Sequence, residues 1–83
     1  MNAEIPQQVD QYLDAKGLSC PLPLLKTKQV LAKMAVDQVL HVEATDAGSW
    51  RDIQVFVEHS VHVLVAANNE NGLFSYWIRK GES

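Results

Sequence analysis

The sequence has few of the residues that most often reveal a mechanism: one cysteine, three histidines and three prolines in 83 residues. A single cysteine excludes an internal disulfide and an internal Cys-x-x-Cys redox pair. One cysteine and three scattered histidines also do not make a zinc ligand set, so we expect no metal and no other cofactor. Any exchange of a disulfide or of sulfur at this cysteine therefore requires a second molecule.

The sequence also lacks long apolar runs, a net positive charge and the features of a signal peptide. The apolar runs span only a few residues, which excludes a transmembrane helix, and residues 1–6 lack the basic and apolar regions of a signal peptide. The net charge of −3 argues against direct nucleic-acid binding, because phosphates require a basic face. An unpaired cysteine suits a reducing compartment. We therefore expect a cytoplasmic protein, without membrane association, that is a monomer.

The chain is long enough for one small domain, which we expect over residues 9–80, with a flexible leader at 1–8 and a tail at 81–83. Apolar periodicity predicts strands at 9–14, 39–44, 61–67 and 73–79, and helices at 21–35 and 49–59. A hairpin turn is expected over 68–72. The order β-α-β-α-β-β predicts an α/β (α+β) two-layer sandwich, a four-stranded mixed sheet with both helices on one face.

The first helix has one clear core face and two leucines that do not belong to it. At about 100° per residue, the core arc consists of Leu24, Thr27, Val30, Leu31, Met34 and Ala35. Leu22 and Leu25 project on the far side, close to Cys20. Either the N-terminal segment covers them, or they form a small exposed apolar patch, with Lys26 beside it, that binds a partner protein.

Cys20 is the candidate reactive residue, because it lies where a strand turns into a helix and is followed by Pro21 and Pro23. Prolines are favoured in a first helical turn, and they fix where this helix begins. The free N–H groups of a helix start carry partial positive charge, so we expect a lowered pKa for the Cys20 thiol. An inert core cysteine would not need this placement.

A second polar segment precedes the helix at 49–59. Ser49 and Asp52 fit a capping box, which alone explains their presence. This junction follows a strand as Cys20 does, and two such junctions tend to meet at one edge of a sheet. We therefore expect Asp46 and Arg51 near Cys20, with Arg51 stabilising a thiolate or persulfide anion. Three residues are expected to have structural roles only: His41, His59 and His62.

Residues 13–23, Leu-Asp-Ala-Lys-Gly-Leu-Ser-Cys-Pro-Leu-Pro, resemble the opening of the TusA/SirA-like sulfur carrier family, whose mark is Cys-Pro-x-Pro at the first helix start. The resemblance extends over about residues 9–80, through Ala44-Thr45-Asp46, Gly48-Ser49, Arg51-Asp52-Ile53, His62 and Ile78-Arg79-Lys80. The chain departs from the family's usual residues at Ala47, often proline, at Val61, often glycine, and in Val36-Asp37-Gln38, which lacks a common glycine.

The resemblance implies a two-layer α/β sandwich in which Cys20 carries sulfur as a persulfide, with Asp46 and Arg51 at polar positions of the second helix start. Its members take sulfur from a cysteine desulfurase and pass it to an acceptor protein, for tRNA 2-thiouridine, molybdenum-cofactor assembly or sulfur oxidation. This hypothesis makes the chain a sulfurtransferase-type carrier without independent turnover. The alternatives are a thiol-based regulatory or protein-interaction module in which Cys20 is only a redox sensor, and a structural subunit that uses its apolar surface.

Overall fold

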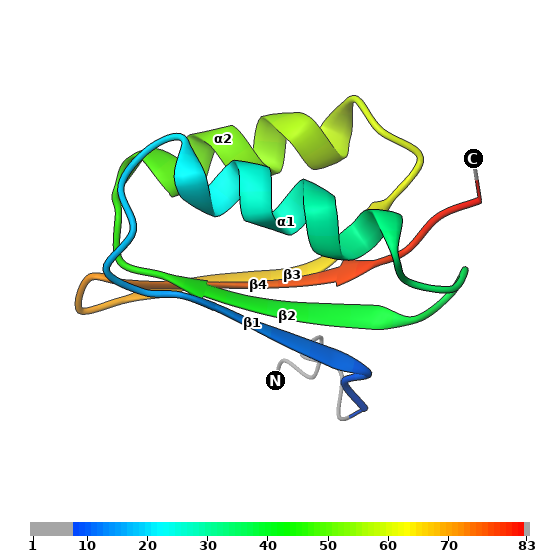
Figure 1. Ribbon diagram of the computed structural model, residues 1–83. Helices are drawn as coiled ribbons and strands as arrows, with labels where there is room; N and C mark the ends of the chain where they lie inside the picture. Colours follow the sequence, from blue (N-terminus) through cyan, green and yellow to red (C-terminus); the bar gives the residue numbers. More distant parts are fainter. Residues whose placement is uncertain (1–7, 83) are drawn as a thin grey trace.

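The computed structural model describes residues 8–82, and its six elements follow the order β-α-β-α-β-β. They are β1 (Gln11–Ala15), α1 (Leu22–Ala32), β2 (Val39–Ala44), α2 (Gly48–Glu58), β3 (Val63–Glu70) and β4 (Leu73–Arg79). The sheet order is β1-β2-β4-β3, with β1 parallel to β2 and β4 antiparallel to both of its neighbours. Both helices cover one face of the sheet (Figure 1). The predicted two-layer sandwich with a mixed sheet is therefore confirmed; the expected leader lies, except for its last residue, outside the described residues.

Alternating side chains of the two central strands divide the sheet into a helix-facing side and an open side. The helix-facing residues pair across the strands as Leu40 with Ile78, Val42 with Tyr76, and Ala44 with Phe74. All six are buried in the core. A fully buried side chain of the size of leucine or isoleucine contributes about 1.5–3 kcal/mol, so this double row anchors the layer on which the helices rest.

Helix α1 is shorter than predicted and ends at Ala32, with Lys33 as its C-cap. Most of the predicted core arc faces the sheet, since Thr27, Leu31 and Met34 are buried. Ala35 is exposed, so its assignment to the core was wrong: the chain has already left the helix at that point.

The β3–β4 hairpin has a tighter turn than the sequence predicted. Asn71 and Gly72 have φ values of 54° and 82°, which matches the two-residue turn that joins twisted antiparallel strands. Because the turn needs only these residues, β3 runs from Val63 to Glu70, and the prediction of a strand at 61–67 followed by a loop at 68–72 was wrong. The β2 and β4 boundaries agree with the prediction, whereas β1 is shifted toward Ala15.

The open side of the sheet has an aromatic row across β1, β2 and β4. The His41 ring stacks on Trp77 at 4.4 Å between centroids, and Tyr12 meets His41 edge-on at 5.5 Å. Burial lowers the pKa of His41. Trp77 is only 8% exposed, so this side is less open than its lack of helices implies.

The other two histidines bind backbone atoms near the ends of elements. His59 Nδ1 lies 2.9 Å from the Val55 carbonyl at the end of α2, and His62 Nδ1 accepts a hydrogen bond from the Gly81 N–H at 2.9 Å. These contacts agree with the structural role expected for both residues. No helix within residues 8–82 has the length and apolar character needed to cross a bilayer.

Candidate functional site

The loops that lead into the two helices meet at one end of the sheet. Strands β1 and β2 run parallel, so their carboxyl ends, and the helix starts that follow, lie on the same edge (Figure 1). A Cβ atom added to Gly48 at the start of α2 would lie 3.6 Å from Cys20 Cβ and 3.9 Å from Cys20 Sγ. The expected meeting of the two junctions is therefore confirmed.

Cys20 is exposed, and its thiol donates a hydrogen bond to Asp52 Oδ2 at 3.2 Å. This bond joins the loop before α1 to the first turns of α2. The hydrogen bond to Asp52 raises the pKa of the Cys20 thiol, and partial desolvation and the charges of Asp52 and Asp46 act in the same direction. The expectation of a lowered pKa at this helix start was therefore wrong.

The reversal follows from the backbone groups at the start of α1. Pro21 is the N-cap and Pro23 is in the first turn, so neither position supplies an N–H. The Leu22 N–H already donates to the Ser19 carbonyl at 2.9 Å. The partial charge of a helix start resides on unpaired N–H groups, and few remain here to face the sulfur. A full negative charge on Asp52 outweighs them.

Asp46 places a second carboxylate beside the thiol. A Cβ on Gly48 would lie 2.9 Å from Asp46 Oδ2, so the missing side chain of this glycine makes room for both Asp46 and Cys20. Asp46 Oδ2 is buried and has no hydrogen-bond partner among the described residues. The sequence prediction named Asp46 but missed Gly48, although the glycine beside Ser49 was a visible signal.

Ser49 does not cap helix α2, so the predicted capping box was wrong. The helix begins at Gly48 with Ala47 as N-cap, and no side chain caps it. Ser49 is 2% exposed, and its hydroxyl shares a hydrogen bond with the Tyr76 hydroxyl at 2.8 Å. Burial raises the pKa of Tyr76 to about 12. Ser49 and Tyr76 therefore form a polar contact beneath the site, between α2 and the sheet.

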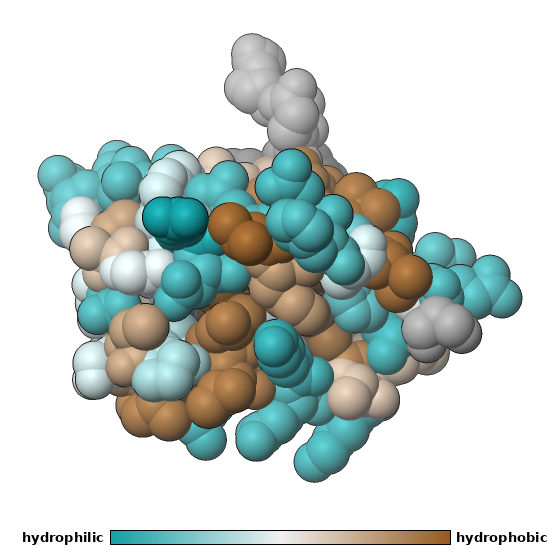
Figure 2. Space-filling view, turned by 90° about the horizontal axis from the view of Figure 1, so that it is seen from above, coloured by the Kyte–Doolittle hydropathy of each residue, from teal (hydrophilic) through white to brown (hydrophobic). Residues whose placement is uncertain are grey.

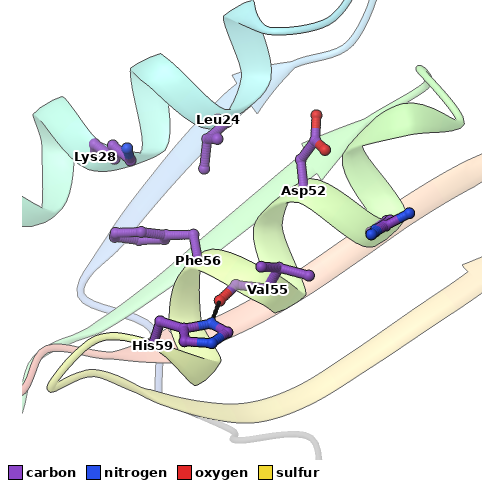
Figure 3. A pocket seen from close by; sticks show the side chains of 7 residues that line it. Leu24, Lys28, Asp52, Val55, Phe56 and His59 are labelled. Atoms are coloured by element: carbon purple, nitrogen blue, oxygen red, sulfur yellow. Dashed lines mark hydrogen bonds between the residues drawn. The ribbon is translucent and has the colours of Figure 1, made fainter.

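A groove between the helices has a volume of about 580 Å³. Leu24 from α1 and Phe56 from α2 both extend into the space between the two helices (Figure 3). Lys28 Nζ lies 5.2 Å from the centre of the Phe56 ring, a cation–π contact. The remaining wall residues belong to α2 and its C-cap: Arg51, Asp52, Val55 and His59.

Asp52 connects this groove to the sulfur, because it lines one and binds the other. Arg51 is exposed on the groove wall, and none of the contacts within residues 8–82 joins it to Cys20. The thiol is thus contacted by Asp52, whereas the sequence analysis had expected the neighbouring residue, Arg51, to lie beside it. The sequence signal for Asp52 was present but had been assigned to a helix cap.

Leu22 and Leu25 are exposed, at 42% and 44%, so the described part of the N-terminal segment, residues 8–19, does not cover them; residues 1–7 lie outside the described part of the chain. Lys26 beside them is also exposed. On the helical face, apolar groups alternate with hydrophilic ones (Figure 2). We call Leu22, Leu25 and Lys26 the α1 patch. Within residues 8–82 no three His, Cys, Asp or Glu side chains gather in a way that could hold a metal ion.

Comparisons with known proteins show the family to which the chain belongs. The family model described as sulfurtransferase TusA matches residues 11–80, nearly the whole domain. The chain belongs to the TusA family. Its TusA relatives include the sulfur carrier protein TusA of Allochromatium vinosum, 46% identical over 71 residues, which are 86% of this chain and 93% of the relative.

A second TusA relative, the sulfur carrier protein TusA of Pseudomonas syringae, is 44% identical over 72 residues, covering 87% of this chain and 86% of the relative. Among solved structures, a SirA-like protein from Desulfitobacterium hafniense superposes with a TM-score of 0.75 at 25% identity, covering 88% of this chain and 100% of that one. Membership of the TusA family supports a sulfur carrier role and, with it, interaction with sulfur donor and acceptor proteins.

Proposed function

We propose that the protein carries sulfur as a persulfide on Cys20, taking it from a donor protein such as a cysteine desulfurase and passing it to an acceptor protein. The observation that carries the proposal is an exposed cysteine at the junction of two helix starts in a chain of the TusA family. Pro21 and Pro23 support the function indirectly, since they determine where α1 begins and so where the sulfur lies.

Loading is a transfer of the outer sulfur atom of the donor persulfide. The Cys20 sulfur, having lost its proton, attacks that outer sulfur; the donor's S–S bond breaks and its own sulfur leaves as a thiolate. The product is Cys20–S–SH, and the donor is left as a thiol after it takes up a proton. Delivery repeats the step with an acceptor thiolate. No net oxidation occurs, because one S–S bond forms for each that breaks.

The composition of the chain suits a relay of this kind. With one cysteine, the protein has no second thiol of its own that could attack the persulfide and release the sulfur. The reducing conditions of the cytoplasm, which we propose as its compartment, keep the unloaded thiol available. The donor and acceptor therefore determine both ends of the route.

The surface around the thiol provides contact area for both proteins. The α1 patch presents two exposed leucines next to Cys20, and the groove between the helices adds Leu24 and Phe56. Apolar surface of this kind, bordered by charged residues, is typical of transient docking sites. The acceptor would belong to tRNA 2-thiouridine formation, molybdenum-cofactor assembly or sulfur oxidation, and mixed disulfides trapped on Cys20 would identify which.

The test is a loading reaction with a cysteine desulfurase and cysteine, read by intact-protein mass spectrometry. The expected result is the added mass of one sulfur atom, removed again by a reducing agent and absent in Cys20→Ser. Oxidant-induced sulfenic acid on Cys20 without any sulfur adduct from several donors would instead support a redox sensor. That outcome would overturn the proposal.

A further inference from the structure

We propose that Asp46 and Asp52 make Cys20 selective by charge, so that sulfur-exchange partners that bring positive charge to the sulfur react faster than partners that bring negative charge. The inference rests on the proposed function, since it describes which donors and acceptors the carrier accepts. The partner class is a protein whose reacting cysteine is flanked by lysine or arginine side chains.

Two carboxylates from one segment lie beside the sulfur. Asp52 Oδ2 is 3.2 Å from Cys20 Sγ. Asp46 and Cys20 border the same small space at Gly48, because a Cβ added there would lie 2.9 Å from Asp46 Oδ2 and 3.9 Å from Cys20 Sγ. An anion that approaches the sulfur therefore meets one carboxylate in contact with it and a second one nearby, and both charges act on the Cys20 sulfur.

No cation neutralises this pair among residues 8–82. The ion pairs there join Lys16 to Asp14 and Glu43, and His41 to Glu43, and none of them includes Asp46 or Asp52. Asp46 Oδ2 has no hydrogen-bond partner in the same part of the chain. Arg51 follows the groove wall and forms no ion pair with either carboxylate. The field at the sulfur is therefore set by acidic groups.

The selectivity has a use for a carrier. Each transfer brings a thiolate to the sulfur or releases one from it, so negative charge is always near Cys20 during the reaction. A partner with basic residues beside its cysteine offsets the repulsion, whereas a small anionic thiol has no means of doing so. Two unit charges about 4 Å apart in water change a rate by roughly fivefold. The persulfide is thus less exposed to free anionic thiols than to its protein partners.

The experiment measures the thiol directly and needs no sulfur donor. Cys20 is reacted with symmetric disulfides that share a two-carbon arm and differ in the charge of its end group: cystamine, hydroxyethyl disulfide and the disulfide of mercaptoethanesulfonate. In each case the Cys20 thiolate attacks one sulfur, a mixed disulfide forms, and one reagent thiolate leaves. The readout is the ratio of the cystamine rate to the sulfonate rate. A change in the thiolate fraction alters all rates together and cancels in that ratio.

The variants are Asp52→Asn and Asp46→Asn, with Asp37→Asn as a matched control at the opposite end of β2. Asp37 has φ 75°, a conformation that asparagine tolerates, so the control changes charge without backbone strain. We expect the ratio to fall roughly 25-fold in Asp52→Asn, because cystamine loses about fivefold and the sulfonate gains about fivefold, to fall in Asp46→Asn, and to stay unchanged in Asp37→Asn. Added salt should reduce it in the wild type.

Equal ratios in the wild type and in Asp52→Asn would overturn the inference. Circular dichroism verifies that each variant is folded, and Asp52→Asn alone decides the matter if Asp46→Asn does not fold. A protein that shows the charge ratio but never accepts sulfur would refute the proposed function and not the charge selectivity. A protein that accepts sulfur but reacts with cystamine and the sulfonate disulfide at equal rates would refute the charge selectivity and not the proposed function.

Discussion

The contact between Ser49 and Tyr76 beneath the site offers a quantitative test of the structure. Ser49→Ala removes the hydroxyl that lies 2.8 Å from the Tyr76 hydroxyl, and leaves a buried polar group without its partner. The cost of an unsatisfied buried group is about 1–3 kcal/mol. Tyr76→Phe likewise leaves the buried Ser49 hydroxyl without its partner and should cost a similar amount. The double variant removes both groups, so its cost should be well below the sum.

The assay is urea unfolding followed by far-UV circular dichroism, for the wild type, both single variants and the double variant. We expect a coupling free energy of about 1 kcal/mol or more, in the range found for residues in direct contact. Each single variant should lower the melting temperature by several degrees, since about 1 kcal/mol corresponds to roughly 4–8 °C in a domain of this size. Coupling measured this way does not depend on which atom donates the hydrogen bond.

Additive effects would refute the arrangement. If Ser49 were an N-cap, Ser49→Ala would still cost about 0.5–2 kcal/mol, but Tyr76→Phe would change stability independently of it. The magnitude of a single variant therefore cannot separate a cap from a buried contact, whereas the coupling can. The same cycle tests whether α2 is attached to the sheet at this point.

Three further predictions concern the site. Alkylation of Cys20 by iodoacetamide should reach half its maximal rate at a pH above the ordinary pKa of a cysteine thiol, because the hydrogen bond to Asp52 and the charge of that carboxylate favour the protonated form. Asp52→Asn should move this midpoint to lower pH, and an unchanged midpoint would contradict the reasoning. Gly48→Ala should reduce sulfur loading in the mass assay, because the added Cβ would lie 3.6 Å from Cys20 Cβ and 2.9 Å from Asp46 Oδ2. For the same reason the variant should not gain the ~1 kcal/mol of stability that replacing a helical glycine normally brings. Full loading would show that the junction tolerates the methyl group. Leu22→Asp or Leu25→Asp should weaken binding to a donor, measured by calorimetry, with an unchanged melting temperature, and unfolding of either variant would show that the leucine is part of the core.

The sequence was sufficient to predict the fold because the information for it is local. Alternation along β2 and β4 depends on residues two apart, so the boundaries 39–44 and 73–79 were right. Asn71-Gly72 indicates a tight turn by itself, and the error in the β3 boundaries came from giving that turn more residues than it needs. The order of elements then left few ways to build a two-layer sandwich.

The site was only partly predictable, because its chemistry depends on contacts between distant segments. Cys20 could be identified from its own neighbours, but the sign of its pKa shift comes from Asp52, which lies 32 residues away in the sequence. The role of Ser49 likewise depends on Tyr76, 27 residues further on. A local pattern, the capping box, explained the same residues plausibly and concealed both contacts.

The hydrogen bond between Cys20 and Asp52 has a consequence for recognition of the cargo. In the unloaded protein the proton beside the carboxylate is on Sγ. In a persulfide Sγ is bonded to carbon and sulfur and has no hydrogen, so that donor no longer exists and only the added sulfur can offer one. Full and empty forms of the carrier would therefore differ in the link between the loop before α1 and helix α2. A partner that contacts both segments could distinguish the sulfur-loaded carrier from the unloaded one before any sulfur is exchanged.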